Sequence, residues 1–216
     1  MKRYRLLFCL LAAATILAGC GVPKRQPVQR VEAHEIQSKG GALVLITIRE
    51  KSAYNLGLGD YSVPVDPAFR PIKVFRMIKG ERKVALSFSR KQRRGGAEVL
   101  VRLDQPWSPG TKLEVRIEGR MPAVHLESKR QTYSFIIPGA WYADYQSASG
   151  QMVEYSANVA LPVEARVTSA TKGYRIPKAR ATDATIIYQW TGRLSPGKAS
   201  RFNISYLPIA QRGGHQ

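Results

Sequence analysis

Cysteine and histidine are the side chains most often used for metal binding and nucleophilic catalysis. This chain of 216 residues has two cysteines and three histidines, at Cys9, Cys20, His34, His125 and His215. They stand far apart in the sequence, and this spacing predicts no metal site with several Cys or His ligands. We interpret His34 as a solvated linker residue and His125 as a surface residue.

Acid pairs and short catalytic or nucleotide-binding motifs predict no catalytic centre either. Glu114 and Glu118 fall on one face of an expected strand, but Arg116 lies between them and neutralises the pair. The sequence contains no Gly-x-Ser-x-Gly, no His-Glu-x-x-His and no Walker loop. We therefore expect no catalytic residues, no metal and no dissociable cofactor, and hence a protein that is not an enzyme.

Cys20 stands at the end of an N-terminal segment with basic and then apolar residues. Basic residues at the start precede an apolar run, Leu6 to Ala18, in which Thr15 is the ordinary polar residue. That length fits a secretory signal and is too short to cross a membrane. The run ends in Leu17-Ala18-Gly19-Cys20, which resembles the lipobox of bacterial lipoproteins. The resemblance implies removal of residues 1–19 as a signal peptide and covalent lipid on Cys20, including an acyl chain such as palmitate.

The residue after the cysteine bears on the membrane in which such a protein stays. In lipoprotein sorting, Asp at this position retains the protein at the inner membrane, and this chain has Gly21. The resemblance thus implies an exported protein anchored by lipid, at the periplasmic face of the outer membrane rather than the inner membrane. The alternative is an ordinary secretory signal with a chance cysteine.

Residues 20–41 carry Pro23, Pro27 and several cations, with little apolar periodicity. This composition predicts a flexible tether that follows the lipidated cysteine. At the other end of the chain, residues 211–216 are expected to be a disordered tail.

From residue 42 onward, apolar residues alternate with polar ones, as Leu113, Val115 and Ile117 do. A period of two is typical of strands with one face in a core and the other in water. The continuous apolar run from Leu43 to Ile48 predicts a central strand. Turn sequences separate the strands and include two copies of Ser-Pro-Gly, at 108–110 and 195–197. These patterns predict an all-β sandwich or barrel, and only Ile72 to Lys79 could also be a short helix.

The repeated Ser-Pro-Gly turn favours two tandem immunoglobulin-like β-sandwich modules, at residues 42–138 and 139–210. Residues 140–208 resemble the immunoglobulin-like repeat of bacterial surface and S-layer-type proteins. The similarity lies in Leu161-Pro162, in Thr168-Ser-Ala-Thr171 and in Leu194-Ser-Pro-Gly197. It implies a spacer, adhesion or docking module and not an enzyme. The alternative is that Ser-Pro-Gly recurs only because it is a common turn.

Positive charge is strongly concentrated in one segment. The chain has 34 Lys and Arg against 15 Asp and Glu, and residues 70–94 contain a single acid, Glu81. We expect a hairpin tip at 90–94 and a basic surface suited to a polyanion or an acidic partner. The candidate anion- or partner-binding residues are Arg82, Lys83, Arg90, Lys91, Arg93 and Arg94. The alternative is a solvated basic surface without a specific ligand.

Three aromatic residues, Trp141, Tyr142 and Tyr145, lie at the expected junction between the modules. They predict either packing between the modules or a ligand surface. Nucleic-acid binding would be helped by exposed aromatic rings beside the cations. Because Phe88 falls on the expected core face, a nucleic-acid partner is the least favoured.

Two functions follow from these patterns. The first is a membrane-anchored lipoprotein that acts as a non-enzymatic binding or scaffolding part of a cell-envelope assembly, with an envelope protein as partner. The second is direct binding of an anionic polymer, namely lipopolysaccharide, an acidic glycan or DNA, through the basic segment 70–94.

Overall fold

The computed structural model describes residues 27–37, 41–51, 59–78, 82–93, 96–122, 126–127, 130–139, 152–177 and 185–207. The secondary structure of these residues consists of strands joined by turns, so the prediction of an all-β protein is confirmed. Within these ranges, no helix has the length and apolar character that a membrane crossing requires.

The strands are numbered in chain order. The first seven are β1 (Val28–Ile36), β2 (Ala42–Lys51), β3 (Asp60–Val65), β4 (Arg70–Ile78), β5 (Arg82–Ala85), β6 (Phe88–Arg93) and β7 (Gly96–Arg102). The others are β8 (Lys112–Met121), β9 (Leu126–Glu127), β10 (Arg130–Pro138), β11 (Val153–Pro162), β12 (Arg166–Ala170), β13 (Thr185–Leu194) and β14 (Ala199–Leu207).

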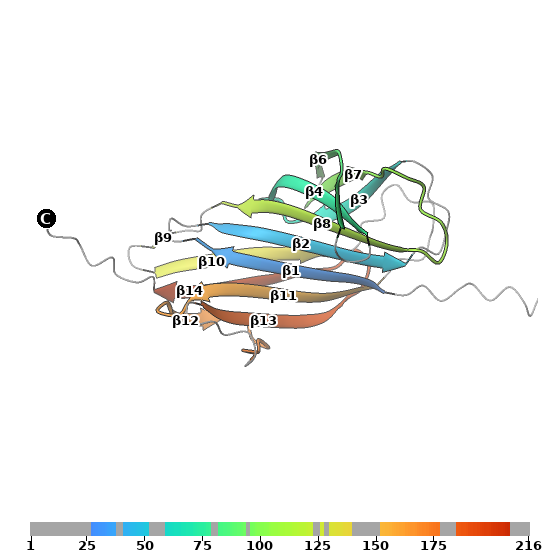
Figure 1. The fold of residues 1–216 in the computed structure, drawn as a ribbon. Helices are drawn as coiled ribbons and strands as arrows, with labels where there is room; N and C mark the ends of the chain where they lie inside the picture. The colour runs from blue at the N-terminus through green and yellow to red at the C-terminus, as the bar shows by residue number, and fades with distance from the viewer. Residues whose placement is uncertain are drawn as a thin grey trace, which may run out of the picture.

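The strands form three sheets. A 7-stranded sheet has the order β13-β11-β1-β2-β8-β4-β5, a 4-stranded sheet the order β12-β14-β10-β9, and a 3-stranded sheet the order β3-β7-β6. In Figure 1 the strands β13, β11, β1, β2 and β8 lie side by side in one layer, with β10 and β14 running behind them. One continuous apolar core connects the large sheet to the two smaller ones.

The apolar side chains of β2 and β8 explain why these strands lie at the centre of the large sheet. Ile46 of β2 lies opposite Ile117 of β8, and both are almost completely buried. Each such side chain contributes about 1.5–3 kcal/mol of hydrophobic stabilisation when buried. The prediction that Leu43 to Ile48 forms a central strand is confirmed, since β2 pairs with β1 on one side and β8 on the other.

Both Ser-Pro-Gly sequences form turns of the same kind. The carbonyl of Ser108 accepts a hydrogen bond from the N–H of Thr111 at 3.2 Å, and that of Ser195 accepts one from Lys198 at 3.1 Å. Gly110 and Gly197 have φ angles of 78° and 68°. Proline at the second position of a turn and a positive φ at the third position are the marks of a type II turn, which explains why glycine follows proline there. Each turn leads directly into a strand, β8 or β14, as expected.

The predicted tether is wrong for residues 28–36. They form β1, which pairs in parallel with β11 on one side and antiparallel with β2 on the other. The prediction failed because the inward residues of β1 are mostly polar, so this strand lacks the apolar alternation of its neighbours. The division expected at residues 138 and 139 does not separate the sheets either, because β1 pairs with β11 and β10 pairs with β14. The immunoglobulin-like character of the modules stays a prediction.

Two local expectations also change. The helical alternative for 72–79 is wrong, because Ile72 to Ile78 belong to β4, which pairs with β5 and β8. Phe88 was expected on the core face but is 36% exposed. The reason is that β5 ends at Ala85 and β6 begins at Phe88 in another sheet, so a period of two does not continue through this segment.

Candidate functional site

The inward face of β1 carries three polar side chains in succession. Arg30, Glu32 and His34 alternate with outward residues, and apolar Val28 and Ile36 flank them at the two ends of the strand. Each of the three is only 3% exposed. Burying a charge costs a large free energy unless the charge is paired and hydrogen-bonded, so these side chains need partners inside the core.

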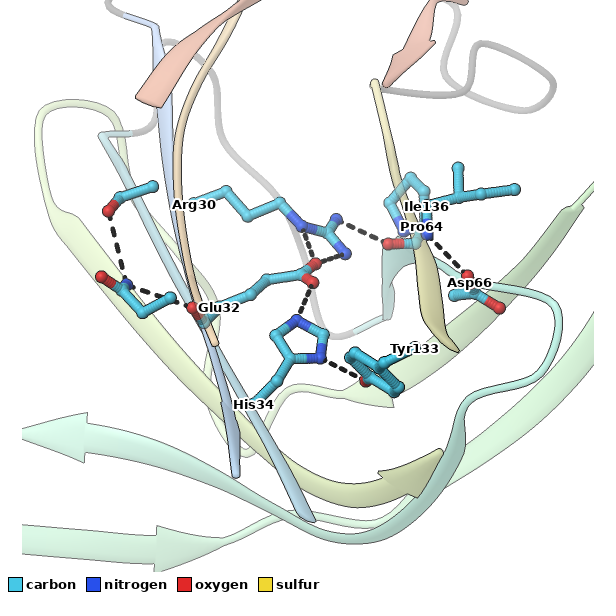
Figure 2. Close-up of polar contacts among 9 residues, drawn as sticks. Arg30, Glu32, His34, Pro64, Asp66, Tyr133 and Ile136 are labelled. Carbon is cyan, nitrogen blue, oxygen red and sulfur yellow. Dashed lines mark hydrogen bonds and ion pairs between the residues drawn. The ribbon is translucent and has the colours of Figure 1, made fainter. Parts of the chain in front are cut away.

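Arg30 binds an acid and a backbone carbonyl. Its Nε donates to Glu32 Oε1 at 2.6 Å, and its Nη1 donates to the carbonyl oxygen of Pro64 in β3 at 2.6 Å. Figure 2 shows both contacts. The third nitrogen, Nη2, lies 2.5 Å from Glu32 Oε1 as an ion pair but lacks the geometry of a hydrogen bond. The guanidinium is therefore fixed to both the large sheet and the 3-stranded sheet.

His34 extends the contacts to the 4-stranded sheet. Its Nε2 lies 2.9 Å from Glu32 Oε2, and its Nδ1 lies 2.7 Å from the hydroxyl oxygen of Tyr133 in β10. A proton on Nε2 satisfies both contacts, because the ring then donates to Glu32 and accepts from Tyr133. The ring also packs against Phe135, with 4.2 Å between ring centroids. Arg30, Glu32, His34 and Tyr133 thus form one chain of contacts, which we call the inner polar network (Figure 2).

The electrostatics of the inner polar network fix its protonation. Burial alone would raise the pKa of Glu32, but the charge of Arg30 and the hydrogen bonds that His34 and Arg30 donate outweigh burial and hold that pKa below its ordinary value. Burial, reinforced by the negative charges of Glu32 and Asp66, raises the pKa of Tyr133 far above its ordinary value. Glu32 is consequently ionised at neutral pH, and Tyr133 remains a hydrogen-bond donor.

Asp66 makes a second link between sheets beside this network. It follows β3, where its Oδ1 accepts a hydrogen bond from the N–H of Ala68 and its Oδ2 accepts one from the N–H of Ile136 in β10, both at 2.7 Å. Burial raises the pKa of Asp66, although these two backbone hydrogen bonds act in the opposite direction. Figure 2 shows the bond to Ile136.

These contacts stand where two sheet edges meet. β3 is the last strand of the 3-stranded sheet, and β10 pairs with the short β9 only at Arg130 and Gln131. Backbone groups at such edges need hydrogen-bond partners when they are buried. Arg30 supplies a donor to the β3 edge, and Asp66 supplies an acceptor to the β10 edge. The polar side chains therefore join all three sheets at one place.

The chemical capacity of the inner polar network is limited by its burial. A carboxylate, an imidazole and a phenol in hydrogen-bond contact are suited to proton transfer. However, Glu32, His34 and Tyr133 are each 3% exposed or less, so none presents an atom to a dissolved substrate. Among the described residues, no group of three or more His, Cys, Asp or Glu side chains could hold a metal ion. The arrangement fits a structural role, and the solvated role expected for His34 is wrong.

A small cavity of about 100 Å³ opens beside the same meeting of edges. Val65 and Pro67 line one side, and Ile136, Pro138 and Lys198 line another. Lys198 is the one ionisable side chain in its lining. A general base or nucleophile paired with an orienting acid is therefore lacking from the described lining of this cavity.

The structure places three of the predicted basic residues inside a strand. Arg90, Lys91 and Arg93 belong to β6, which pairs with β7 from Phe88 to Arg93. The expectation that they project from a hairpin tip is wrong, because each forms part of a hydrogen-bonded ladder. Their direction is then set by the strand, so successive side chains point to opposite faces.

Two of these arginines are already engaged within the chain. Arg90 donates from Nε to the carbonyl oxygen of Phe69 at 3.0 Å and from Nη2 to that of Pro67. Arg93 donates from Nε to Glu98 Oε1 at 2.6 Å. Neither guanidinium is therefore a freely available anion ligand, which the sequence could not reveal.

The remaining described cations of the predicted site lie at the surface. The ammonium of Lys83 lies 5.3 Å from the centre of the Phe75 ring and 3.8 Å from Glu118 Oε1. Arg82 and Lys91 are exposed. The structure therefore brings the predicted basic residues onto two different sheets, β5 on the large sheet and β6 on the 3-stranded sheet.

Other predicted residues lie outside the described ranges. They are Cys20, Arg94, His125, Trp141, Tyr142 and Tyr145. The same holds for the signal peptide 1–19 and the tail 211–216, so the expectations for all of them stay predictions.

Sequence reasoning missed Arg30, Glu32, Asp66 and Tyr133. The sequence carried no signal for the first two, because polar residues stand on both faces of β1 and the period of two appears only in the burial of its side chains. No sequence pattern pointed to the contacts of Tyr133 or Asp66, which depend on how distant strands pack.

Comparison with known proteins gives a distant likeness. No family model matches the chain, and no curated protein matches it. Among solved structures, an M1 zinc metallopeptidase from Deinococcus radiodurans is similar, with a TM-score of 0.49 and 11% sequence identity. A variant of that enzyme bound to a Tyr-Ser-Ala substrate gives 0.49 and 12%. The match covers 84% of this chain but only 42% of the peptidase chains.

Proposed function

We propose that this protein is an exported lipoprotein, anchored through lipid on Cys20, that acts as a non-enzymatic binding component of a cell-envelope assembly. The observation that carries the proposal is the buried position of the side chains that have acid–base chemistry. Glu32, His34 and Tyr133, which could serve catalysis if exposed, are buried and bond one another to join three sheets. The outer surfaces of the sheets are therefore the parts of the described structure that a partner can contact.

The anchor rests on the sequence Leu17-Ala18-Gly19-Cys20 and on the apolar run before it. Covalent acyl chains bind a bilayer with about 0.8 kcal/mol per buried methylene, so two or more chains anchor a protein firmly. With Gly21 after the cysteine, the proposed location is the periplasmic face of the outer membrane.

Metabolic labelling with palmitate tests the anchor. The Cys20→Ser variant should lose the label and keep its signal peptide, because the acceptor sulfur is gone. Cys9→Ser is the matched control and should be labelled like the wild type, since Cys9 lies within the segment that is removed. Label that persists in Cys20→Ser, or is missing from the wild type, would overturn the lipoprotein assignment.

A second candidate function is binding of an anionic polymer. Arg82 and Lys91 are exposed and Phe88 is 36% exposed, so cations and one aromatic ring are accessible in this region. Titration with lipopolysaccharide at rising salt tests it, because phosphate contacts weaken steeply with salt. Affinity that falls with salt and with the variant Arg82→Gln/Lys91→Gln would favour this function over a protein partner.

A further inference from the structure

One end of the molecule lies close to the lipid that we propose on Cys20. Val28 begins β1, and eight peptide units separate it from Cys20. A flexible chain of that length spans about 16 Å on average, and a polyproline II chain spans about 25 Å. Both are shorter than β1 itself, which is about 27 Å long. The start of β1 therefore lies nearer to the membrane than its end does.

Several other strand ends lie beside the start of β1. They are the end of β2, the start of β8, the start of β11 and the end of β13. The pairs that fix this register are Gln29–Arg49, Lys51–Lys112, Val28–Val153 and Val153–Leu194. In Figure 1 this end of the large sheet lies at the right, where the arrowhead of β2 points. Together with the turn from Ser195 to Lys198, which follows β13, we call it the tether end.

The tether end carries three exposed lysines, Lys51, Lys112 and Lys198. Lys51 and Lys112 lie directly opposite each other on β2 and β8, where like charges repel. Glu50 points to the other face of β2, where it accepts a hydrogen bond from the Tyr61 hydroxyl at 2.8 Å. In the described part of the chain, none of the three lysines has an ion-pair partner. An external anion would relieve the repulsion between Lys51 and Lys112.

Acids on the neighbouring strand positions are already engaged. Glu114 of β8 pairs with Arg49 and with Arg116, both at 2.9 Å. Glu154 of β11 pairs with Arg193 of β13 at 2.8 Å. These acids therefore do not balance the charge of the three lysines.

An exposed apolar side chain lies beside the residue at which β1 begins. Met152 is 44% exposed, and its carbonyl oxygen accepts a hydrogen bond from the N–H of Val28 at 2.9 Å. At a bilayer surface, apolar side chains enter the boundary of the acyl chains while lysines contact the headgroups. A dissolved phosphate or polyanion offers nothing apolar. The combination of lysines and Met152 therefore favours a lipid surface.

The covalent anchor also favours the membrane over other anions. A short linker keeps the groups at its two ends at a high effective concentration, so contacts that are weak singly become populated. Anionic headgroups attract each nearby lysine, and each such contact shifts the docking equilibrium by about fivefold. The tether end thus meets headgroups continuously, whereas a dissolved partner must arrive by diffusion.

We propose that the tether end docks onto anionic phospholipid headgroups of the membrane that holds the acyl chains, with Lys51, Lys112 and Lys198 as the contacting cations. The inference rests on the proposed function, because it requires lipid on Cys20. Docking at this end directs the strands of the large sheet away from the membrane. The opposite end, where Ile36 and Met121 lie, then faces a partner in the envelope.

Energy transfer from a dye on the protein to an acceptor lipid tests this orientation. The full-length, lipidated protein is reconstituted into vesicles of equal parts phosphatidylglycerol and phosphatidylcholine. The donor dye is attached at Ser195→Cys on the tether end, or at Val163→Cys just after β11 at the opposite end, and both positions are exposed. We expect more transfer from Ser195→Cys, and a smaller difference between the two positions in vesicles of phosphatidylcholine alone.

Neutralising the lysines gives the second arm. The triple variant Lys51→Gln/Lys112→Gln/Lys198→Gln should lower the ratio of docked to undocked protein by at least about tenfold. Transfer from Ser195→Cys should then fall to its value in phosphatidylcholine vesicles. High salt should have the same effect on the wild type, because it screens the attraction.

The matched control removes the same charge from exposed positions away from the tether end. The triple variant Arg70→Gln/Lys73→Gln/Arg120→Gln changes residues of β4 and β8. We expect transfer from Ser195→Cys to be unchanged in this variant. Circular dichroism and urea unfolding of both triple variants confirm that they are folded.

Three outcomes would overturn the inference: equal transfer from the two dye positions, transfer that does not depend on phosphatidylglycerol, and equal loss in both triple variants. Palmitate labelling and vesicle flotation separate this failure from that of the proposed function. Labelled protein that floats and gives equal transfer keeps the anchor and rejects the docked tether end. Protein that carries no lipid rejects both.

Discussion

Arg30 and Glu32 point inward from the same strand, two residues apart, and the Nε of Arg30 donates to Glu32 Oε1 at 2.6 Å inside an otherwise apolar core. His34 and Tyr133 continue this contact to β10, and Pro64 continues it to β3. The pair therefore does more than neutralise itself, since its remaining hydrogen-bonding groups join the three sheets.

Glu32→Gln should destabilise the fold by about 3–5 kcal/mol, because it leaves the buried charge of Arg30 without its counter-ion. Urea unfolding followed by tryptophan fluorescence measures the change. Glu114→Gln is the matched control, since Glu114 pairs with Arg49 and Arg116 near the surface. Its expected cost is at most about 1 kcal/mol. Equal costs for the two variants would contradict the structural role of Glu32.

The double variant Arg30→Met/Glu32→Leu should be less destabilised than the sum of the two single variants. It removes both charges together, so neither is left unpaired in the core. The carbonyl oxygen of Pro64 still loses its donor, which leaves a residual cost of about 1–3 kcal/mol. Additive effects in a double-mutant cycle would show that the two side chains do not act as a pair.

The stability of the protein should decrease in acid, and Glu32 should account for part of that decrease. Its folded-state pKa lies below the ordinary value of 4.5, so its contribution is fully present above that pH and is lost as the pH falls through the lowered pKa. Asp66 acts in the opposite direction, because its raised pKa means that the folded state favours the protonated acid.

Unfolding free energies measured between about pH 3 and pH 7 test this linkage. The acid-dependent loss should be smaller in Glu32→Gln than in the wild type, since the variant has no proton to take up at this position. An identical pH dependence in the two proteins would show that Glu32 titrates alike when folded and unfolded.

Tyr133→Phe should cost about 1–3 kcal/mol, because the buried Nδ1 of His34 loses its hydrogen-bond donor. Tyr206→Phe provides a control that also removes one tyrosine hydroxyl, here the donor to Gln131 Oε1 at 2.7 Å. Gln131 is partly accessible to water, so the expected cost there is about 0.5–1.5 kcal/mol. Thermal or urea unfolding compares the two, and a larger loss for Tyr206→Phe would argue against the inner polar network.

Gly119→Ala should destabilise the large sheet by about 1–3 kcal/mol or more through overpacking. A Cβ at Gly119 would clash with Cζ of Phe69 and would lie 2.5 Å from the carbonyl oxygen of Arg70. Gly192→Ala is the comparison, because the three atoms nearest to its Cβ would all belong to the Tyr155 side chain, starting with the hydroxyl at 2.6 Å. That side chain can move, so we expect the smaller loss there. The reverse order of unfolding midpoints would contradict the packing described for Phe69.

Much of the fold follows from patterns that are local in the sequence. The alternation in β8 predicts which of its residues are buried, and the two Ser-Pro-Gly sequences predict turns before β8 and β14. These predictions succeed because side-chain direction in a strand and the φ angle of a turn glycine depend on near neighbours only. The same reasoning from near neighbours placed Arg90 at a hairpin tip, which was wrong. Only its pairing with β7 shows that the residue lies within a strand.

The sequence by itself determined that the chain is all-β, where most of its strands lie, and that its charge is strongly positive. Only the tertiary structure decided that residues 28–36 form a strand within the largest sheet and that Arg30, Glu32, His34 and Tyr133 meet. The physical reason is that the sequence does not show whether a polar residue in a strand faces water or the core. Water and a buried partner satisfy the same hydrogen bonds, and which of them a side chain meets depends on strands up to 126 positions away, the separation between Glu32 and Asn158.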